Sequence, residues 1–326
     1  MERNDVNVSA GGEKVTAPDP AQDRAANALI VTERLSKRFG SVRAVADLSL
    51  EVDAGEIVGF LGPNGAGKTT TIRMLMGFIK PSAGRCSVLG GSLRDKPQLR
   101  RRVGYLPGDF RMDPAMSGRD LLRWFGRLRG GVDRGRVEEL TSRLQLDPSR
   151  RFGTLSKGNR QKIGIVQAFM NDPEVLILDE PTTGLDPLIQ REFLELVRTA
   201  AGRGAAVLFS SHVLPEVERM ASRVAIIRAG RLVMLSAVDQ LVEHARHRLE
   251  LRFASAVPHD LFQDVSGVVG QEVDGKSVVI TLDGPAGAAM RVAASGPGLL
   301  RVSSAGDDLE EMFLKLYDGR PEGLDA

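Results

Sequence analysis

A glycine-rich segment from Gly62 to Thr69 contains the residues whose types and spacing point most clearly to chemistry. It reads Gly-Pro-Asn-Gly-Ala-Gly-Lys-Thr, which fits the phosphate-loop pattern in full. An apolar strand pattern precedes it and a helical pattern follows, so inward N–H groups and the positive helix end would hold a polyphosphate. We expect Lys68 to reach the β- and γ-phosphates of a nucleoside triphosphate. The residues predicted to contact the nucleotide here are Gly62, Pro63, Asn64, Gly65, Ala66, Gly67, Lys68, Thr69 and Thr70.

A second apolar segment, Val175 to Leu178, ends in the two carboxylates Asp179 and Glu180. Asp179 would reach the Mg²⁺ shell beside the Thr69 hydroxyl, and Glu180 would face the γ-phosphate and polarise an attacking water. A strand that meets charged residues as it leaves the core is common. Downstream of a complete phosphate loop, however, the catalytic interpretation is favoured. The sequence therefore predicts Glu180 as the catalytic base and Thr69 and Asp179 as metal ligands.

Three further motifs stand in the order that one family shows. Leu155 to Lys162 reads Leu-Ser-Lys-Gly-Asn-Arg-Gln-Lys and resembles a family signature usually written Leu-Ser-Gly-Gly-Gln. Pro181 to Asp186 matches the family's D-loop, and Ser210-Ser211-His212 matches its switch histidine. With the phosphate loop, these motifs make the chain resemble the ATP-binding-cassette (ABC) ATPases over roughly residues 28–235.

The resemblance implies a role for each of these residues. In the family the signature meets the γ-phosphate held by the other subunit, so Ser156 and the Gly158 N–H would act across a dimer interface. Asp186 would be the acidic D-loop residue, His212 a sensor of the γ-phosphate, and Phe39 the aromatic residue that stacks on adenine. Taken alone, Ser156 would pass as a helix N-cap, His212 as a surface residue and Phe39 as part of the core.

Two departures from the family pattern bear on the site. Lys157 and Asn159 replace the usual glycine and glutamine of the signature. Gly108 stands where the family's loop after Tyr-Leu-Pro carries a glutamine. Asp109, one residue on, would bind Mg²⁺ if the glycine let the loop swing inward; alternatively, it closes a Pro-Gly turn and binds nothing. Both departures resemble a branch of exporter-type ATPases that pair with separate membrane subunits.

Composition sets bounds on the class of protein. The chain has 326 residues, 42% of them hydrophobic and 26% charged, with a formal net charge of +2, so bulk charge gives little reason to expect a nucleic-acid partner. Its single cysteine, Cys86, excludes an internal disulfide and fits a reducing compartment. No apolar run reaches the length of a membrane-spanning helix, and the N-terminus lacks the apolar core of a secretory signal.

The pattern of elements predicts an α/β fold. Short apolar strands alternate with helices, as in a P-loop NTPase core with a largely parallel sheet. The strands near Ile30 and Val45 indicate an antiparallel β subdomain, residues about 113–170 a helical subdomain, and residues 94–102 a further helix. We expect a disordered tail over residues 1–27, an ABC ATP-binding domain over 28–240, and a small α+β accessory domain over 246–318.

The resemblance implies an ATP- and Mg²⁺-dependent ATPase that drives an exporter. It would form a homodimer around two ATP molecules and lie, as a peripheral protein, on the cytoplasmic side of the cell membrane. Its partner would be an ABC-2-like membrane permease on a separate chain. Two alternatives stay open: a soluble ABC ATPase acting on nucleic acid or ribosomes, and an import ATPase with a C-terminal regulatory domain. Nucleic acid is not expected, because acidic residues interrupt the arginines of residues 113–170.

Overall fold

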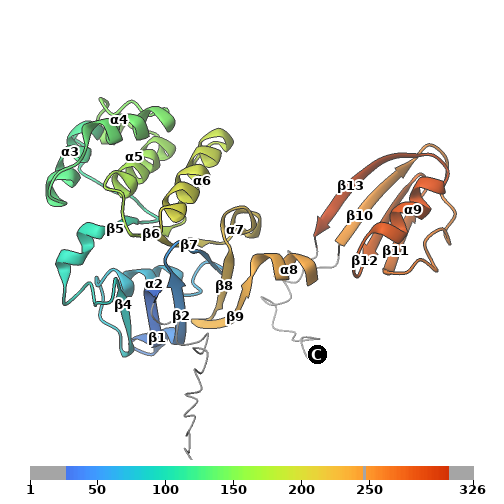
Figure 1. Cartoon of the computed structure of the whole chain (residues 1–326), viewed down its shortest axis with the longest axis horizontal. Helices are drawn as coiled ribbons and strands as arrows, with labels where there is room; N and C mark the ends of the chain where they lie inside the picture. The colour runs from blue at the N-terminus through green and yellow to red at the C-terminus, as the bar shows by residue number, and fades with distance from the viewer. Residues whose placement is uncertain (1–26, 245–246, 308–326) are drawn as a thin grey trace, which may run out of the picture.

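The computed structural model describes residues 27–244 and 247–307. Figure 1 shows a larger body of sheets and helices that runs as far as α8, and a smaller body of strands with one helix after it. Almost all of the predicted N-terminal tail, and the accessory domain beyond residue 307, lie outside the described residues. Among the described residues, no helix combines the length and the apolar character needed to cross a membrane.

A six-stranded sheet forms the centre of the larger body, in the order β5-β6-β7-β3-β8-β9. All neighbouring strands are parallel except the pair β8 and β9. Every residue of β3 and β6 is buried, which explains why charged residues are absent from both strands except for Asp179 at the end of β6. The predicted α/β core with a largely parallel sheet is confirmed. The strands are β3 (Ile57–Leu61), β5 (Val103–Leu106), β6 (Val175–Asp179), β7 (Ala206–Ser211), β8 (Arg223–Arg228) and β9 (Arg231–Ala237).

The parallel strands place their following loops at one edge of the sheet, where ligands bind in open α/β folds. The phosphate loop follows β3, the two carboxylates close β6, and the switch histidine follows β7. These segments are far apart in the sequence, and the sheet brings them side by side. The connecting helices are α2 (Lys68–Leu75), α6 (Pro187–Gly202), α7 (Leu214–Met220) and α8 (Val238–His244). Val238 and Leu241 of α8 pack into the main core, so this core extends into that helix.

An antiparallel sheet, in the order β2-β1-β4 as the strand pattern predicted, packs in a second core that it shares with Val58 and Phe60 of β3. Its strands are β1 (Ala28–Phe39), β2 (Val42–Asp53) and β4 (Ala83–Val88). The helix predicted over residues 94–102 is instead a short 3₁₀ helix, η1 (Pro97–Arg102). Pro97 explains the later start, because the residue before a proline is disfavoured in the α conformation.

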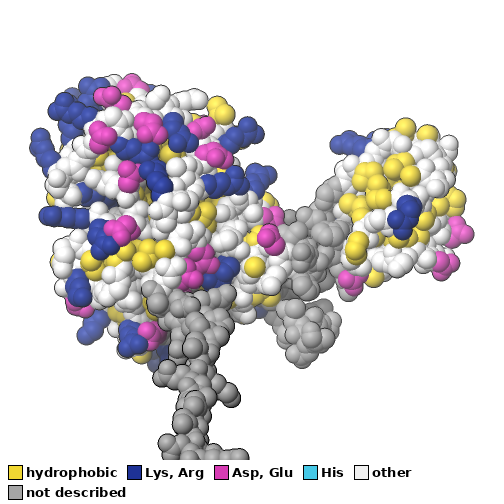
Figure 2. Space-filling view, in the orientation of Figure 1, with side chains coloured by type: hydrophobic (Ala, Val, Ile, Leu, Met, Phe, Trp, Pro, Cys, Tyr) yellow, Lys and Arg dark blue, Asp and Glu magenta, His cyan; other side chains and the backbone are white. Residues whose placement is uncertain are grey.

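The helical part of the larger body contains α3 (Gly118–Leu128), α4 (Arg134–Arg143), the short η2 (Phe152–Thr154) and α5 (Lys157–Phe169). Polar N-caps start the three α-helices, and their side chains accept hydrogen bonds from backbone N–H groups: Ser117, Asp133 and Ser156. Their apolar faces join the main core through residues such as Leu121 and Leu140. Figure 2 shows Lys and Arg side chains gathered over this part of the surface, with Asp and Glu among them.

The smaller body has a core of its own, which includes Leu251, Phe253, Phe262 and Ile280. Its sheet is antiparallel, in the order β11-β12-β10-β13, and α9 packs on it through Ala289 and Ala293. This confirms the predicted small α+β fold after the ATP-binding domain. The elements are β10 (His247–Phe253), β11 (Val268–Asp274), β12 (Ser277–Leu282), α9 (Gly287–Ser295) and β13 (Leu299–Asp307).

Candidate nucleotide site

The phosphate loop joins β3 to α2, as its sequence predicted, and its glycines are required by close contacts. A Cβ on Gly62 would lie 2.5 Å from the Ile227 carbonyl oxygen, and one on Gly67 would lie 2.6 Å from the Ala44 carbonyl oxygen. Gly67 also has a φ of 111°, which side chains rarely tolerate. The backbone can therefore wrap tightly, and the loop ends at the first turn of α2, where free N–H groups attract anions.

Lys68 brings one cation into the mouth of this loop. Its side chain is only 6% exposed, and its ammonium donates hydrogen bonds to the carbonyl oxygens of Gly62 at 2.5 Å and Pro63 at 3.3 Å. The same nitrogen lies 3.3 Å from Oε1 of Glu180. A triphosphate in the loop would contact this buried ammonium group directly. The predicted catalytic carboxylate of Glu180 would lie beside the same ammonium group.

Asp179 forms the predicted metal side of the site. It is almost fully buried, and its Oδ2 accepts a hydrogen bond of 2.9 Å from the Thr69 hydroxyl. Its Oδ1 accepts a second one, of 2.6 Å, from the hydroxyl of Ser210 on β7. A carboxylate and a threonine hydroxyl are hard oxygen ligands, and their closeness fits Mg²⁺.

Glu180 and His212 meet beside the phosphate loop. Oε2 of Glu180 lies 2.8 Å from Nδ1 of His212, whose side chain is about half exposed. Glu180 has a φ of 49°, in the left-handed region that residues other than glycine rarely adopt. Such strain persists only where the surroundings hold it, and it is common in functional sites. One carboxylate thus faces both the loop lysine and the switch histidine.

The signature residues contact their own helix and the D-loop. Ser156 caps α5 and accepts a hydrogen bond of 3.3 Å from the Asn159 N–H. Gly158 packs on the D-loop, where a Cβ would lie 2.5 Å from the Gly184 carbonyl oxygen. Asp186 caps α6. Within residues 27–244 and 247–307, no hydrogen bond or ion pair joins Ser156, Gly158 or Asp186 to the phosphate loop.

Phe39 stands at the end of β1 with about half of its surface exposed. The Lys37 ammonium lies 5.0 Å from the centre of its ring. Its exposure leaves a ring face that an adenine could cover, and it is not the core residue that its apolar type would suggest.

Comparison with known proteins identifies the family to which this chain belongs. Residues 45–183 match the model of the family "ABC transporter". The chain is 34% identical over 289 residues to the Nod factor export ATP-binding protein I of Burkholderia lata, an alignment that covers 86% of this chain and 94% of the relative. The chain belongs to the ABC transporter ATP-binding proteins.

Two further comparisons agree with this assignment. The bacitracin transport ATP-binding protein BcrA of Bacillus licheniformis is 34% identical, over 89% of this chain and 98% of that protein. A solved structure described as an ATP-binding subunit of an ABC transporter shares 32% identity, with a TM-score of 0.61 over 65% of this chain and 91% of the other. The ABC fold and the ATP-hydrolysing activity predicted from the motifs are thus confirmed.

In this ABC cassette, several polar residues to which the motifs assigned no role hold the functional segments in place. Ser210 accepts the Glu180 N–H at 3.0 Å while it donates to Asp179. Glu216 accepts hydrogen bonds of 2.7 Å from both Thr182 in the D-loop and Ser211 beside the switch histidine. Gln161 donates to the Pro181 carbonyl oxygen at 3.0 Å and so ties the signature helix to the D-loop. Their partners lie far away in the sequence or in another motif, so a linear pattern carries no signal for them.

Asp109 of the ABC cassette does not join Asp179 and Thr69. Its carboxylate pairs with Arg111 at 2.6 Å, and its side chain is 67% exposed. The hydrogen bond from Arg111 holds the pKa of Asp109 below its ordinary value. Gly108 is the residue that faces the site, because a Cβ there would lie 3.4 Å from Oδ2 of Asp179. This arrangement favours the alternative in which Asp109 is a loop residue.

We therefore expect Asp109→Asn to leave unchanged the Mg²⁺ concentration that gives half-maximal ATPase activity. Asp179→Asn, the matched change at the buried carboxylate, should raise that concentration at least tenfold, roughly the effect of losing 1.4 kcal/mol of binding energy. The measurement is a Mg²⁺ titration of phosphate release at saturating ATP. A several-fold shift for Asp109→Asn would show instead that the loop swings inward and supplies a ligand.

Proposed function

We propose that this chain is the ATP-driven motor subunit of an exporter and works as a homodimer bound to an ABC-2-like permease on a separate chain. Two relatives at 34% identity are named for export of Nod factor and transport of bacitracin, which supports an export role. The chain would then lie peripherally on the cytoplasmic side of the membrane that holds the permease.

The proposed dimer gives each separated motif a place in one reaction. Each ATP would lie between the phosphate loop of one copy and Ser156 and Gly158 of the other. Glu180 would accept the proton of the attacking water, and His212 would fix that carboxylate and sense the γ-phosphate. Thr69 and Asp179 would hold Mg²⁺, which neutralises charge on the phosphate oxygens when it is bound.

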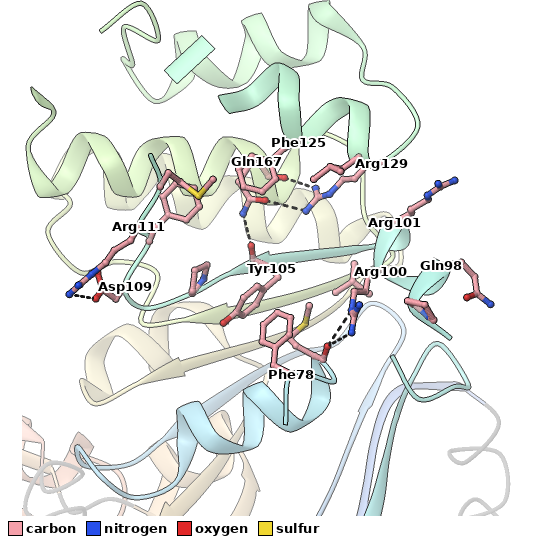
Figure 3. A pocket seen from close by; sticks show the side chains of 17 residues that line it. Phe78, Gln98, Arg100, Arg101, Tyr105, Asp109, Arg111, Phe125, Arg129 and Gln167 are labelled. Atoms are coloured by element: carbon pink, nitrogen blue, oxygen red, sulfur yellow. Dashed lines mark hydrogen bonds and ion pairs between the residues drawn. The ribbon is translucent and has the colours of Figure 1, made fainter. Parts of the chain in front are cut away.

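A groove beside the Tyr105–Asp109 loop is the observation that supports the proposed permease partner. Its volume is about 830 Å³, and it lies between the central sheet and the helical part (Figure 3). Its aromatic residues are Phe78, Tyr105, Phe110 and Phe125, and its arginines are Arg100, Arg101, Arg111 and Arg129. Asp109, the acidic residue in its lining, is already paired with Arg111. A mostly apolar lining with excess positive charge fits a short amphipathic helix that carries a carboxylate.

Leu128→Asp tests this partner surface without touching the nucleotide site. Leu128 lines the groove and is 54% exposed, so the chain should fold normally with aspartate there. In cells that make the chain and its permease, the membrane-bound share should fall about tenfold, because the new carboxylate would replace an apolar contact and repel the carboxylate of the partner. The measurement is quantitative immunoblotting of washed membranes and supernatant, with ATP binding by the purified chain as a check on folding.

Val233→Asp is the matched control. Val233 is 48% exposed on β9, at the opposite edge of the central sheet from β5 and the groove. It should leave the distribution between membrane and supernatant unchanged. If Leu128→Asp stays on the membrane as the wild type does, the groove is not the docking surface.

A further inference from the structure

Gln167 on α5 forms a buried junction of hydrogen bonds at the floor of the groove (Figure 3). Gln167 is only 2% exposed. The side-chain amide donates to the Tyr105 carbonyl oxygen and, at 3.0 Å, to that of Gly164. Its Oε1 accepts a hydrogen bond of 3.2 Å from Arg129, which also donates to the backbone oxygen of Gln167. Every polar atom of this amide therefore has a specific partner.

Arg129 connects the junction to α3. It follows the last residue of that helix, and its N–H bonds to the carbonyl oxygens of Phe125 and Gly126. Burial lowers the pKa of its guanidinium to about 10. In the part of the chain that the structure describes, no carboxylate forms an ion pair with it, so the two oxygens of Gln167 are the acceptors that hold this cation. Without these two oxygens the buried guanidinium would be poorly solvated, so their loss would cost free energy.

Tyr105 connects the junction to the metal side of the nucleotide site. It lies on β5 and pairs with Ile177 of β6, two residues before Asp179. Burial, and after it the negative charge of Asp179, raise the pKa of the Tyr105 hydroxyl to about 12. Three residues later, Gly108 passes over Asp179 and has no side chain with which to anchor the loop. Gln167 thus holds the strand that leads into the loop over Asp179.

We propose that Gln167 is a positioning residue that couples the Asp179 side of the nucleotide site to helix α3. The path begins at Asp179, which ends β6 and lies under Gly108, and it passes to β5 because Tyr105 pairs with Ile177 of β6. Hydrogen bonds then join the Tyr105 carbonyl oxygen to Gln167, and Gln167 to Arg129. A shift of Asp179 and the loop when Mg²⁺ and nucleotide bind therefore moves the end of α3, which forms one wall of the groove. The proposal rests on nucleotide binding by the family and not on the proposed permease.

The chain carries a natural reporter for this coupling. Trp124 is its single tryptophan, and it lies on α3 with its ring 5.0 Å from that of Phe125. Phe125 in turn packs against Phe110 of the groove, with 6.3 Å between ring centres. A movement of α3 against its neighbours changes the surroundings of this indole, so tryptophan emission reads α3 specifically.

The experiment titrates the full chain with Mg²⁺ and the slowly hydrolysed analogue ATPγS. Tryptophan emission follows α3, and calorimetry gives the nucleotide Kd. In the wild type, emission should change saturably with the same Kd. In Gln167→Leu, Kd should move less than about threefold while the emission change falls at least about threefold. Gln263→Leu, an exposed glutamine of the smaller body, is the matched control and should behave as the wild type.

Gln167→Glu separates positioning from mere stability. A carboxylate keeps the acceptor for Arg129 but cannot donate to the Tyr105 carbonyl oxygen, so it breaks one end of the path. This variant should fold and bind nucleotide, yet lose the emission change as Gln167→Leu does. The proposal is overturned if either variant keeps the full emission change. It is equally overturned if wild-type emission does not respond to bound nucleotide, because α3 is then not coupled to the site.

Discussion

Glu180→Gln is expected to lower ATP turnover by about 10²–10⁴-fold, the usual range for a lost general base, while ATP binding persists. The amide keeps the size and shape of the carboxylate next to Lys68 and His212, but it has no negative charge and cannot accept a proton from water. ATP should then remain in the closed dimer. Steady-state phosphate release measures the loss, and size-exclusion chromatography in Mg²⁺ and ATP measures the accumulated dimer.

Glu192→Gln provides the control for this result. Glu192 lies on α6 and pairs with Arg143 at 3.2 Å, away from the nucleotide site. The same chemical change there should leave turnover within about twofold of the wild type, since partly exposed ion pairs contribute little. Near-normal hydrolysis by Glu180→Gln would mean that another group polarises the water.

Ser156→Arg should abolish ATPase activity while each copy still binds ATP. Among the residues that the structure describes, no hydrogen bond or ion pair joins Ser156 to the phosphate loop of its own copy, and its side chain caps α5. Arginine removes that cap, which costs about 0.5–2 kcal/mol, and places a long side chain on the surface that would face the partner's ATP. ATPase assays and equilibrium ATP binding on the purified variant measure the two effects separately.

Ser117→Arg distinguishes loss of a cap from loss of a shared site. Ser117 caps α3 in the same way, and it accepts a hydrogen bond of 3.1 Å from the Asp120 N–H. This variant should lose a similar amount of stability and keep its ATPase activity. Equal loss of activity in both variants would show that Ser156 acts only through the stability of its helix.

The parts of the site that could be predicted from the sequence are contiguous along the chain. Gly62 to Thr69 forms its loop from its own glycines, and Asp179 and Glu180 end a strand whose burial is evident from its apolar residues. The sheet then brings the two segments together, and parallel topology was enough to expect this.

The residues that could not be predicted owe their roles to contacts distant in sequence. Gln167 meets Tyr105 across 62 residues, and Ser210 meets Asp179 across 31. Asp109 illustrates the opposite difficulty, because its local pattern fits a metal ligand and a turn equally well. Its contact with Arg111, which no motif includes, favours the turn. The order of strands in the smaller body likewise depends on long-range pairing and was not predicted.

Mixing Lys68→Ala and Ser156→Arg copies tests most directly the central claim that two copies build each ATPase site. Each variant alone should be inactive, but a mixed dimer joins the intact phosphate loop of one copy to the intact signature of the other. An equal mixture should recover roughly a quarter of the wild-type rate, since about half of the dimers are mixed and each has one intact site of two. If differently tagged copies are shown to associate in ATP and the mixture stays inactive, the shared site is contradicted.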